Sequence, residues 1–203
     1  MQKGTVRKAT HTSVMVYLFP EIIKQFKRKF PECELQVVNR SRKDILSMLS
    51  DGEADIGICS LSTIPPAMNY EVFAKFARVL IAPKGHPLSK KSGITLKDIA
   101  QYPLILPPCG SNTRAIIDQE FKEKDLEYKI AMEITGREAI KTYVEMGLGV
   151  SFINEFYLTK EDRKDLFIRD VSNYFGQAER GIVTRNGKYL SKHITELLKI
   201  LQE

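Results

Sequence analysis

The feature that most constrains the fold of this chain is a regular alternation of short apolar runs and amphipathic segments. Residues 4–9, 33–39 and 54–60 have the character of strands, whereas 16–30 and 42–52 carry apolar residues at the three- and four-residue spacing of helices. The last of these strands is apolar along its length, which is typical of a strand covered on both faces of a parallel sheet. The alternation predicts an α/β fold with mostly parallel sheets.

The same alternation continues through the rest of the chain, after an extended stretch at 68–88 that has no helix caps. We expect helices over 95–100, 109–125, 135–149 and 191–201, and strands over 102–107, 128–134, 150–154, 166–171 and 178–186. A chain of 203 residues with this many elements has room for two small sheets and a substantial core. No fixed-period repeat interrupts the pattern.

Composition argues against a membrane protein or a disulfide-rich one. Apolar residues make up 43% of the chain and charged residues 28%, and no apolar run approaches the ~20 residues that span a bilayer. The polar, basic start MQKGTVRKAT is not a signal peptide. Cys33, Cys59 and Cys109 are widely spaced and the histidines are scattered, so neither disulfides nor a metal site is predicted. Free thiols favour a cytoplasmic location, and a secreted chain that has lost its signal stays open.

The net charge of +6 suits anionic small ligands or nucleic acid. However, the basic residues are spread over 24–30, 40–43 and 84–91, which indicates a solvated surface. No helix-turn-helix, zinc-finger or RNA-binding motif is recognisable. Binding of nucleic acid by this stretch itself is therefore not predicted.

Sets of residues rich in hydroxyls, amides and glycine lie at four places where a predicted strand turns into a helix. They are Thr10, His11, Thr12 and Ser13 in the first turn; Cys59, Ser60 and Ser62 in the second; Gly110, Ser111, Asn112 and Thr113 in the third; and Thr135, Gly136 and Arg137 in the fourth. In open parallel sheets, ligands bind at the carboxyl ends of strands, beside helix N-termini that present unpaired N–H groups. Hydroxyls from several such turns can converge on an anion or a small polar molecule.

The competing interpretation of each turn is helix capping, which uses Ser, Thr and Asn for the same N–H groups. One cap residue per helix would suffice, so four turns of this kind favour a ligand cleft. Arg137 either meets an anionic ligand or is a solvated arginine. No catalytic set emerges, because no GxSxG, P-loop, GxGxxG or HExxH motif is present and no histidine lies near Cys109 in the sequence. We therefore predict neither an enzyme nor a cofactor.

Five stretches of the chain, in their order and spacing, resemble the effector-binding (regulatory) domain of LysR-type transcriptional regulators. They are FPEIIKQFKRKFPECELQV, DILSMLSDGEADIGI, LIAPKGHPLSKKSGITLKDIAQYPLI, GSNTR and VEMGLGVSFI. The resemblance implies two Rossmann-like subdomains joined by two crossing strands, as in type II periplasmic binding proteins. The first would hold residues 1–80 plus 182–203 and the second 81–181. The crossing strands would be 78–84 and 178–184, with the effector between the subdomains.

Within that family, ATHTSVMVY, DIAQYPLI and AIKTYVEMGLGV are similar to the cysteine-regulon subgroup, the CysB-type regulators. That similarity implies a sulfate, acetylserine-like or small carboxylate effector. It places Thr10, Thr12, Ser13, Ser60 and Thr135 at ligand contacts, with Gly110–Thr113 beside them. Two places depart from the subgroup's pattern. Ser13 stands where a glutamine is expected, and the turn at 107–112 differs from the subgroup's version of this turn, which carries an aromatic residue and a threonine.

The resemblance also implies partners. Full-length members carry an N-terminal winged helix-turn-helix that binds DNA, which is absent here, so this chain would be a fragment of a regulator. Members pair as homodimers, and as tetramers when full-length, using the first helix and the helix after Thr135. Val14, Tyr17, Leu18 and Gln25 would form a partner-facing stripe, unless they pack within the monomer. A solute-binding protein of the same fold that delivers a small anion to a transporter, or an enzyme of that fold, are the alternatives.

Overall fold

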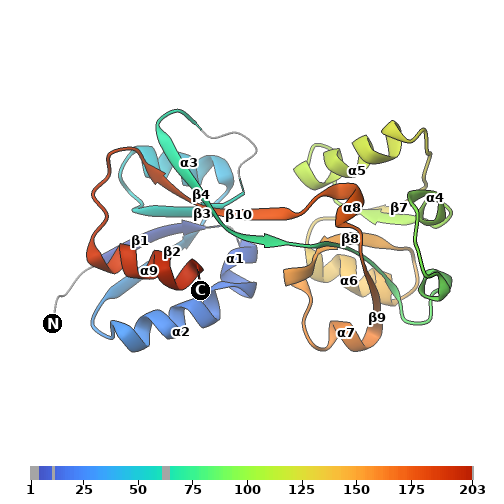
Figure 1. Ribbon diagram of the computed structural model, residues 1–203, viewed down its shortest axis with the longest axis horizontal. Coiled ribbons are helices and arrows are strands. Elements are labelled where there is room, and N and C mark those ends of the chain that lie inside the picture. Colours follow the sequence, from blue (N-terminus) through green and yellow to red (C-terminus); the bar gives the residue numbers. More distant parts are fainter. Residues whose placement is uncertain (1–4, 11, 61–64, 203) are drawn as a thin grey trace. The chain divides into compact units, whose positions relative to one another are not determined.

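The computed structural model describes residues 5–10, 12–60 and 65–202, and the chain divides into two compact units. Unit 1 consists of Met1–Lys75 and Glu179–Glu203, and unit 2 of Phe76–Ala178. Each unit combines a sheet with helices, as Figure 1 shows. The α/β fold predicted from the alternation of strands and helices is therefore confirmed.

The sheet of unit 1 has five strands in the order β2-β1-β3-β10-β4. They are β1 (Thr5–Thr10), β2 (Glu34–Asn39), β3 (Ile56–Cys59), β4 (Met68–Phe76) and β10 (Ala178–Arg185). β1 pairs in parallel with β2 and β3, whereas β10 is antiparallel to β3. The carboxyl ends of β1, β2 and β3 consequently share one edge of the sheet. The chain leaves unit 1 at the end of β4 and returns at the start of β10.

Helices cover both faces of this sheet (Figure 1). They are α1 (Thr12–Tyr17), α2 (Phe19–Lys29), α3 (Arg42–Ser50) and α9 (Lys192–Gln202). On one face, Phe26 of α2 and Leu197 of α9 pack with Ile56 of β3. On the other, Ile45 of α3 packs with Val183 of β10. Successive residues of a strand point to opposite faces of the sheet, so alternate residues pack into two separate apolar layers.

The single helix predicted over 16–30 is in fact two helices that meet at Leu18. Pro20 lies in the first turn of α2, where its missing N–H is not needed. In the interior of one continuous helix the same proline would remove a hydrogen bond and clash with the preceding turn. Val14 is completely buried in a cluster with Phe19 and Ile58. Its predicted place on a partner-facing stripe is therefore wrong.

Unit 2 contains β5 (Arg78–Pro83), β6 (Leu104–Leu106), β7 (Ile130–Glu133), β8 (Ser151–Asn154) and β9 (Leu166–Asp170). β6 and β7 are parallel, and a bridge between Leu104 and Val150 links β6 to the start of β8. β5 is antiparallel to both of its neighbours, β8 and β9. The strands of unit 2 thus form a three-stranded antiparallel sheet, β8-β5-β9, and a two-stranded parallel sheet, β6-β7, so this unit is not mostly parallel as predicted. β5 is reached through an extended segment instead of the helical crossover that a parallel neighbour needs. β5 lies just after the boundary at Phe76 where the chain passes from unit 1 to unit 2, in the stretch that was predicted as the first crossing strand.

The helices of unit 2 surround a core built around β5 and β6. They are η1 (Pro87–Lys90), α4 (Leu96–Ile99), α5 (Asn112–Glu123), α6 (Arg137–Glu145), η2 (Glu155–Tyr157), α7 (Asp162–Asp165) and α8 (Ser172–Phe175). Leu80, Leu104, Phe121 and Phe152 share one buried cluster. In the part of the chain that the structure describes, no helix has both the length and the apolar character that a membrane span requires.

Candidate functional site

In unit 1, two of the predicted hydroxyls lie at the ends of adjacent strands. Thr10 is the last residue of β1 and pairs with Ile58, and Ser60 follows β3 directly. Ser60 is exposed, but Thr10 is completely buried and its Oγ1 donates a hydrogen bond of 3.0 Å to the Ile58 carbonyl. The Thr10 hydroxyl therefore ties β1 to β3, and only the acceptor side of its oxygen is left for a ligand.

The remaining residues of the first turn are placed only in part. Thr12 and Ser13 form the start of α1, so the strand does turn into a helix where the sequence predicted it. Their side chains, and the whole of His11, lie outside the described residues. Whether these groups cap α1 or contact a ligand stays a prediction.

Two arginines that the sequence analysis did not single out lie near the same edge. Arg42 is the first residue of α3, and Arg180 precedes Gly181, which pairs with Cys59. Burial raises the pKa of the Cys59 thiol to about 11, while the positive charges of Arg42 and Arg180 act in the opposite direction. The carboxyl end of β3 is therefore an electropositive place, suited to an anion. In the sequence, the basic stretch RSRK at 40–43 was the only feature that could have pointed to a role for Arg42.

In unit 2, the structure brings the other two predicted turns together. β6 and β7 run in parallel with Leu106 opposite Glu133, and the Ile134 N–H donates to the Leu106 carbonyl at 2.9 Å. The turns that follow these strands emerge at the same edge of the sheet. The predicted residues Asn112 and Thr135, both exposed, consequently lie at neighbouring strand ends.

The two helices that start at this edge differ in how their first turns are capped. At α5, Ser111 is the cap residue, and its Oγ accepts a hydrogen bond of 3.2 Å from the Arg114 N–H. At α6 the cap residue is Gly136, with φ of 95°, and no side chain caps the helix. Only glycine adopts this backbone conformation without strain. Capping therefore explains Ser111, whereas the first N–H groups of α6 are available to an anion beside Thr135.

Gly110 and Arg137, also predicted as ligand contacts, have clear local roles. Gly110 has φ of 86°, a left-handed conformation that the tight turn before α5 requires. Arg137 is the first residue of α6, and its guanidinium lies over the ring of Tyr157, 4.9 Å from the centre. This stacking fixes the direction of the arginine side chain.

Arg114 connects the two turns of unit 2, although the sequence analysis gave it no role. The side chain is buried, and its Nη1 donates to Glu133 at 2.6 Å and to the Pro107 carbonyl at 3.4 Å. Its Nε donates to Asp118 at 2.7 Å. Pro107 begins the turn after β6 and Glu133 ends β7, so one guanidinium holds both turns at the edge where Asn112 and Thr135 lie. The i,i+4 spacing of Arg114 and Asp118 was the only signal in the sequence.

Hydroxyl and N–H groups lie at the strand ends of each unit, and in unit 1 guanidinium groups lie close by. These are the groups that recognise carboxylates, sulfate and related anions. Among the residues that the structure describes, no cluster of three or more His, Cys, Asp or Glu side chains is placed to hold a metal ion.

The sequence and fold place this chain in one family. It belongs to the LysR substrate binding domain family, whose profile matches residues 1–203. This is a family of transcriptional regulators and not of enzymes, in agreement with the prediction that the chain has no catalytic set.

Particular relatives sharpen that assignment. The chain is 32% identical over 193 residues to the HTH-type transcriptional regulator cbl of Escherichia coli, covering 94% of this chain and 60% of that protein. It is 30% identical over 195 residues to the HTH-type transcriptional regulator CysB of Burkholderia cenocepacia, covering 95% and 62%. The predicted resemblance to LysR-type regulators of the CysB type is confirmed. The chain spans about three fifths of the length of these relatives.

Solved structures that are similar to this chain lead to the same family. The cofactor-binding domain of the Cbl transcriptional regulator is similar with a TM-score of 0.88 at 29% identity, over 98% of this chain and 88% of that one. The regulatory domain of Synechocystis PCC6803 CcmR, in complex with 2-PG, is similar with a TM-score of 0.83 at 26% identity, over 98% and 96%. The predicted fold of a LysR-type effector-binding domain is thereby confirmed.

Proposed function

We propose that this effector-binding domain senses a small anion, of the sulfate or acetylserine type or a small carboxylate. The observation that carries the proposal is the start of α6, where no side chain caps the helix and the exposed Thr135 stands directly before it. A helix N-terminus with a neighbouring hydroxyl is a ready-made anion site. The CcmR regulatory domain, solved in complex with 2-PG, supports a small-molecule ligand for this domain.

The proposal assigns contacts in each unit to the same ligand. In unit 1 these are Thr10 and Ser60, with Thr12, Ser13 and His11 as further predicted contacts. In unit 2 they are Thr135 and Arg137, with the turn of Gly110, Ser111 and Asn112 beside them. Arg42 and Arg180 supply the positive charge that the first set lacks. Residues from both units on one ligand are what the family resemblance implies.

For the whole protein, we infer a cytoplasmic homodimer or tetramer that binds DNA through a winged helix-turn-helix outside this chain. The relatives are named HTH-type regulators, and this chain covers about three fifths of their length. Effector binding would then shift an equilibrium between two arrangements of the regulator. A ligand shifts such an equilibrium only by the difference between its affinities for the two states.

Thermal unfolding of the chain against sulfate, thiosulfate, O-acetylserine and a series of small carboxylates tests the proposal. A ligand at 100 times its dissociation constant stabilises the folded state by about 2.7 kcal/mol. A rise in Tm with sulfate or O-acetylserine would establish a sensor of the cysteine-regulon type, and a rise with a carboxylate alone would keep the sensor but discard that subtype. No rise with any member, against sodium chloride at equal ionic strength, would contradict the proposed function.

A further inference from the structure

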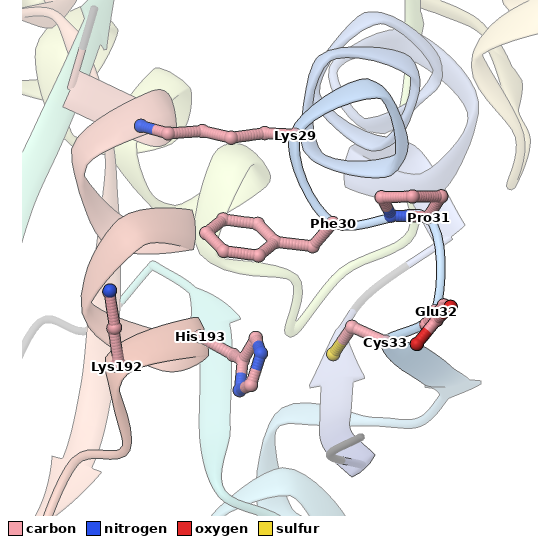
Figure 2. Close-up of a pocket in the computed structure, with 7 residues that line it drawn as sticks. All are labelled: Lys29, Phe30, Pro31, Glu32, Cys33, Lys192 and His193. Atoms are coloured by element: carbon pink, nitrogen blue, oxygen red, sulfur yellow. The ribbon is translucent and has the colours of Figure 1, made fainter. Parts of the chain in front are cut away.

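We propose that unit 1 carries a second ligand site, for a small organic monocarboxylate, in a pocket between the end of α2 and the start of α9. Figure 2 shows the residues that line it: Lys29, Phe30, Pro31, Glu32, Cys33, Lys192 and His193. Cys33 directly precedes β2, so the pocket lies at the amino end of that strand. Thr10 and Ser60 lie at the opposite, carboxyl edge of the same sheet. The pocket is therefore separate from the effector site proposed above.

The pocket has the size of a ligand site, with a volume of about 370 Å³. Its walls come from two elements that pack together, since Phe26, Cys33, Ile194 and Leu197 form one buried cluster below it. An ion pair between Lys29 of α2 and Glu196 of α9 joins the same two helices. The walls are consequently held by packed elements rather than by free loops.

His193 is the residue that points to a ligand. It is only 8% exposed, and its ring stacks edge-on against Phe30, with the ring centres 5.1 Å apart. Within the described part of the chain, neither ring nitrogen has a hydrogen-bond partner, and neither is among the fully buried polar atoms, so both keep some exposure where His193 lines the pocket. An imidazole ring can both donate and accept hydrogen bonds, so these nitrogens can bond to a molecule in the pocket. Figure 2 shows the ring in the pocket between Lys192 and Cys33, where a bound molecule would reach it.

The groups around His193 select an anion. Lys192 and His193 are the first two residues of α9, a helix of 11 residues, so their backbone N–H groups have no partner within the helix. Ser191 caps the third N–H, that of Ile194, at 3.4 Å. The exposed Lys192 ammonium forms no ion pair with the described residues. One carboxylate at this point would meet the ammonium, the imidazole and the positive end of the helix together.

The other residues of the pocket determine how many negative charges the ligand carries and whether its remainder is apolar. Lys29 is already paired with Glu196, which leaves Lys192 as the uncommitted cation among the lining residues that the structure describes. Glu32 adds a negative charge to the lining, which disfavours a doubly charged anion such as sulfate. Phe30 and Pro31 offer apolar surface that a short hydrocarbon body would cover. A monocarboxylate with an apolar chain matches all three features.

An NMR titration of the 15N-labelled chain with aliphatic carboxylates from acetate to hexanoate, and with sulfate, tests this site. We expect saturable shifts of the amides of Phe30, Cys33, His193 and Ile194, with tighter binding as the chain lengthens. His193→Phe keeps the aromatic stacking on Phe30 but removes both nitrogens, and Lys192→Gln removes the ammonium without touching the core. Each should weaken binding roughly tenfold. Lys43→Gln, the matched control, changes an exposed lysine in the first turn of another helix, α3, and should have no effect.

The outcomes separate this site from the effector site. Shifts confined to the segments around Ser60 and Thr135, or no saturable shift of the pocket amides, would overturn the second site while leaving the effector site intact. Unchanged affinity in both Lys192→Gln and a folded His193→Phe would overturn it too. If His193→Phe does not fold, Lys192→Gln alone decides. Equal shifts with sulfate and hexanoate would reject the monocarboxylate.

Discussion

Among single residues, Lys8 is the most unusual in energetic terms. It is almost fully buried on β1, and its Nζ has no hydrogen-bond partner in the described part of the chain. The Nζ lies 4.7 Å from the centre of the Phe19 ring. Burial lowers the pKa of Lys8 from 10.5 to about 7. The amine is therefore held in the core largely without its charge above neutral pH.

This pKa predicts that stability increases with pH. Between pH 7 and 10.5 the unfolded chain holds a proton on Lys8 that the folded chain has lost, so the free energy of unfolding rises with pH. The contribution is at most about 1.4 kcal/mol per pH unit. Urea unfolding at pH 7 and pH 8.5 measures it. Lys8→Met should be more stable at pH 7 and should lack this rise; an identical rise in the variant would mean that Lys8 does not cause it.

Arg114 is also a buried cation, but unlike Lys8 it has ion-pair partners, so its removal should destabilise the fold. Arg114→Met leaves Glu133 and Asp118 without their cation, and we expect a loss of about 2 kcal/mol in the free energy of unfolding. The loss is moderate because the two carboxylates are 43% and 41% exposed. The control is Arg163→Met, which breaks an exposed pair with Glu155 and should cost less than about 1 kcal/mol. Equal losses in the two variants would remove the special role of Arg114.

On the scale of elements, the sequence predicts best where the signal is local. The alternation of apolar runs located the strands, and Thr95 with Asp98 forms the reciprocal cap that begins α4. Three of the four hydroxyl-rich turns lie between a strand and a helix as predicted, whereas the next element described after β3 is the strand β4. Pro20 was visible too, but its consequence for 16–30 was missed, because the apolar spacing runs straight through the break between α1 and α2.

Elements set by distant pairing could not be predicted in this way. Arg180 reaches Cys59 only because β10 pairs with β3 in one particular antiparallel register. The antiparallel position of β5 between β8 and β9 likewise depends on partners far along the chain. Arg114 meets Glu133 because β6 and β7 pair in parallel. A period in the sequence reports which face of a strand is buried, not which strand lies beside it.

A substitution at Gly149 tests how closely the start of β8 packs against the start of β6. A Cβ at this position would lie 2.5 Å from the Pro103 carbonyl oxygen, which also accepts a hydrogen bond of 2.9 Å from the Val150 N–H. The backbone cannot move away without losing that bond, so Gly149→Ala should lower the free energy of unfolding by about 1–3 kcal/mol. Gly93→Ala is the control, because a Cβ there has no atom within 4 Å. Urea unfolding that shows no difference between the variants would contradict this packing.

For the whole molecule, the homodimer proposed from the family resemblance predicts an interface that includes α1. Val14 is buried in unit 1, but Val16 on the same helix is 55% exposed. We expect the chain to sediment as a dimer and Val16→Glu to weaken it by about 2 kcal/mol or more. Val72→Glu, at an exposed valine on β4, is the control. A monomeric chain over the whole concentration series, or dimers of equal strength in both variants, would rule out this interface.

The central proposal to test is that one small anion binds strand-end residues of unit 1 and of unit 2. Calorimetric titration of the anion that raises Tm most in the panel, with one variant in each unit, tests it directly. Ser60→Ala in unit 1 and Thr135→Val in unit 2 should each weaken binding roughly tenfold. Thr142→Val, at an exposed threonine further along α6, should bind as the unmodified chain does. Binding that is unchanged in either Ser60→Ala or Thr135→Val, or no saturable heat at all, would contradict the claim.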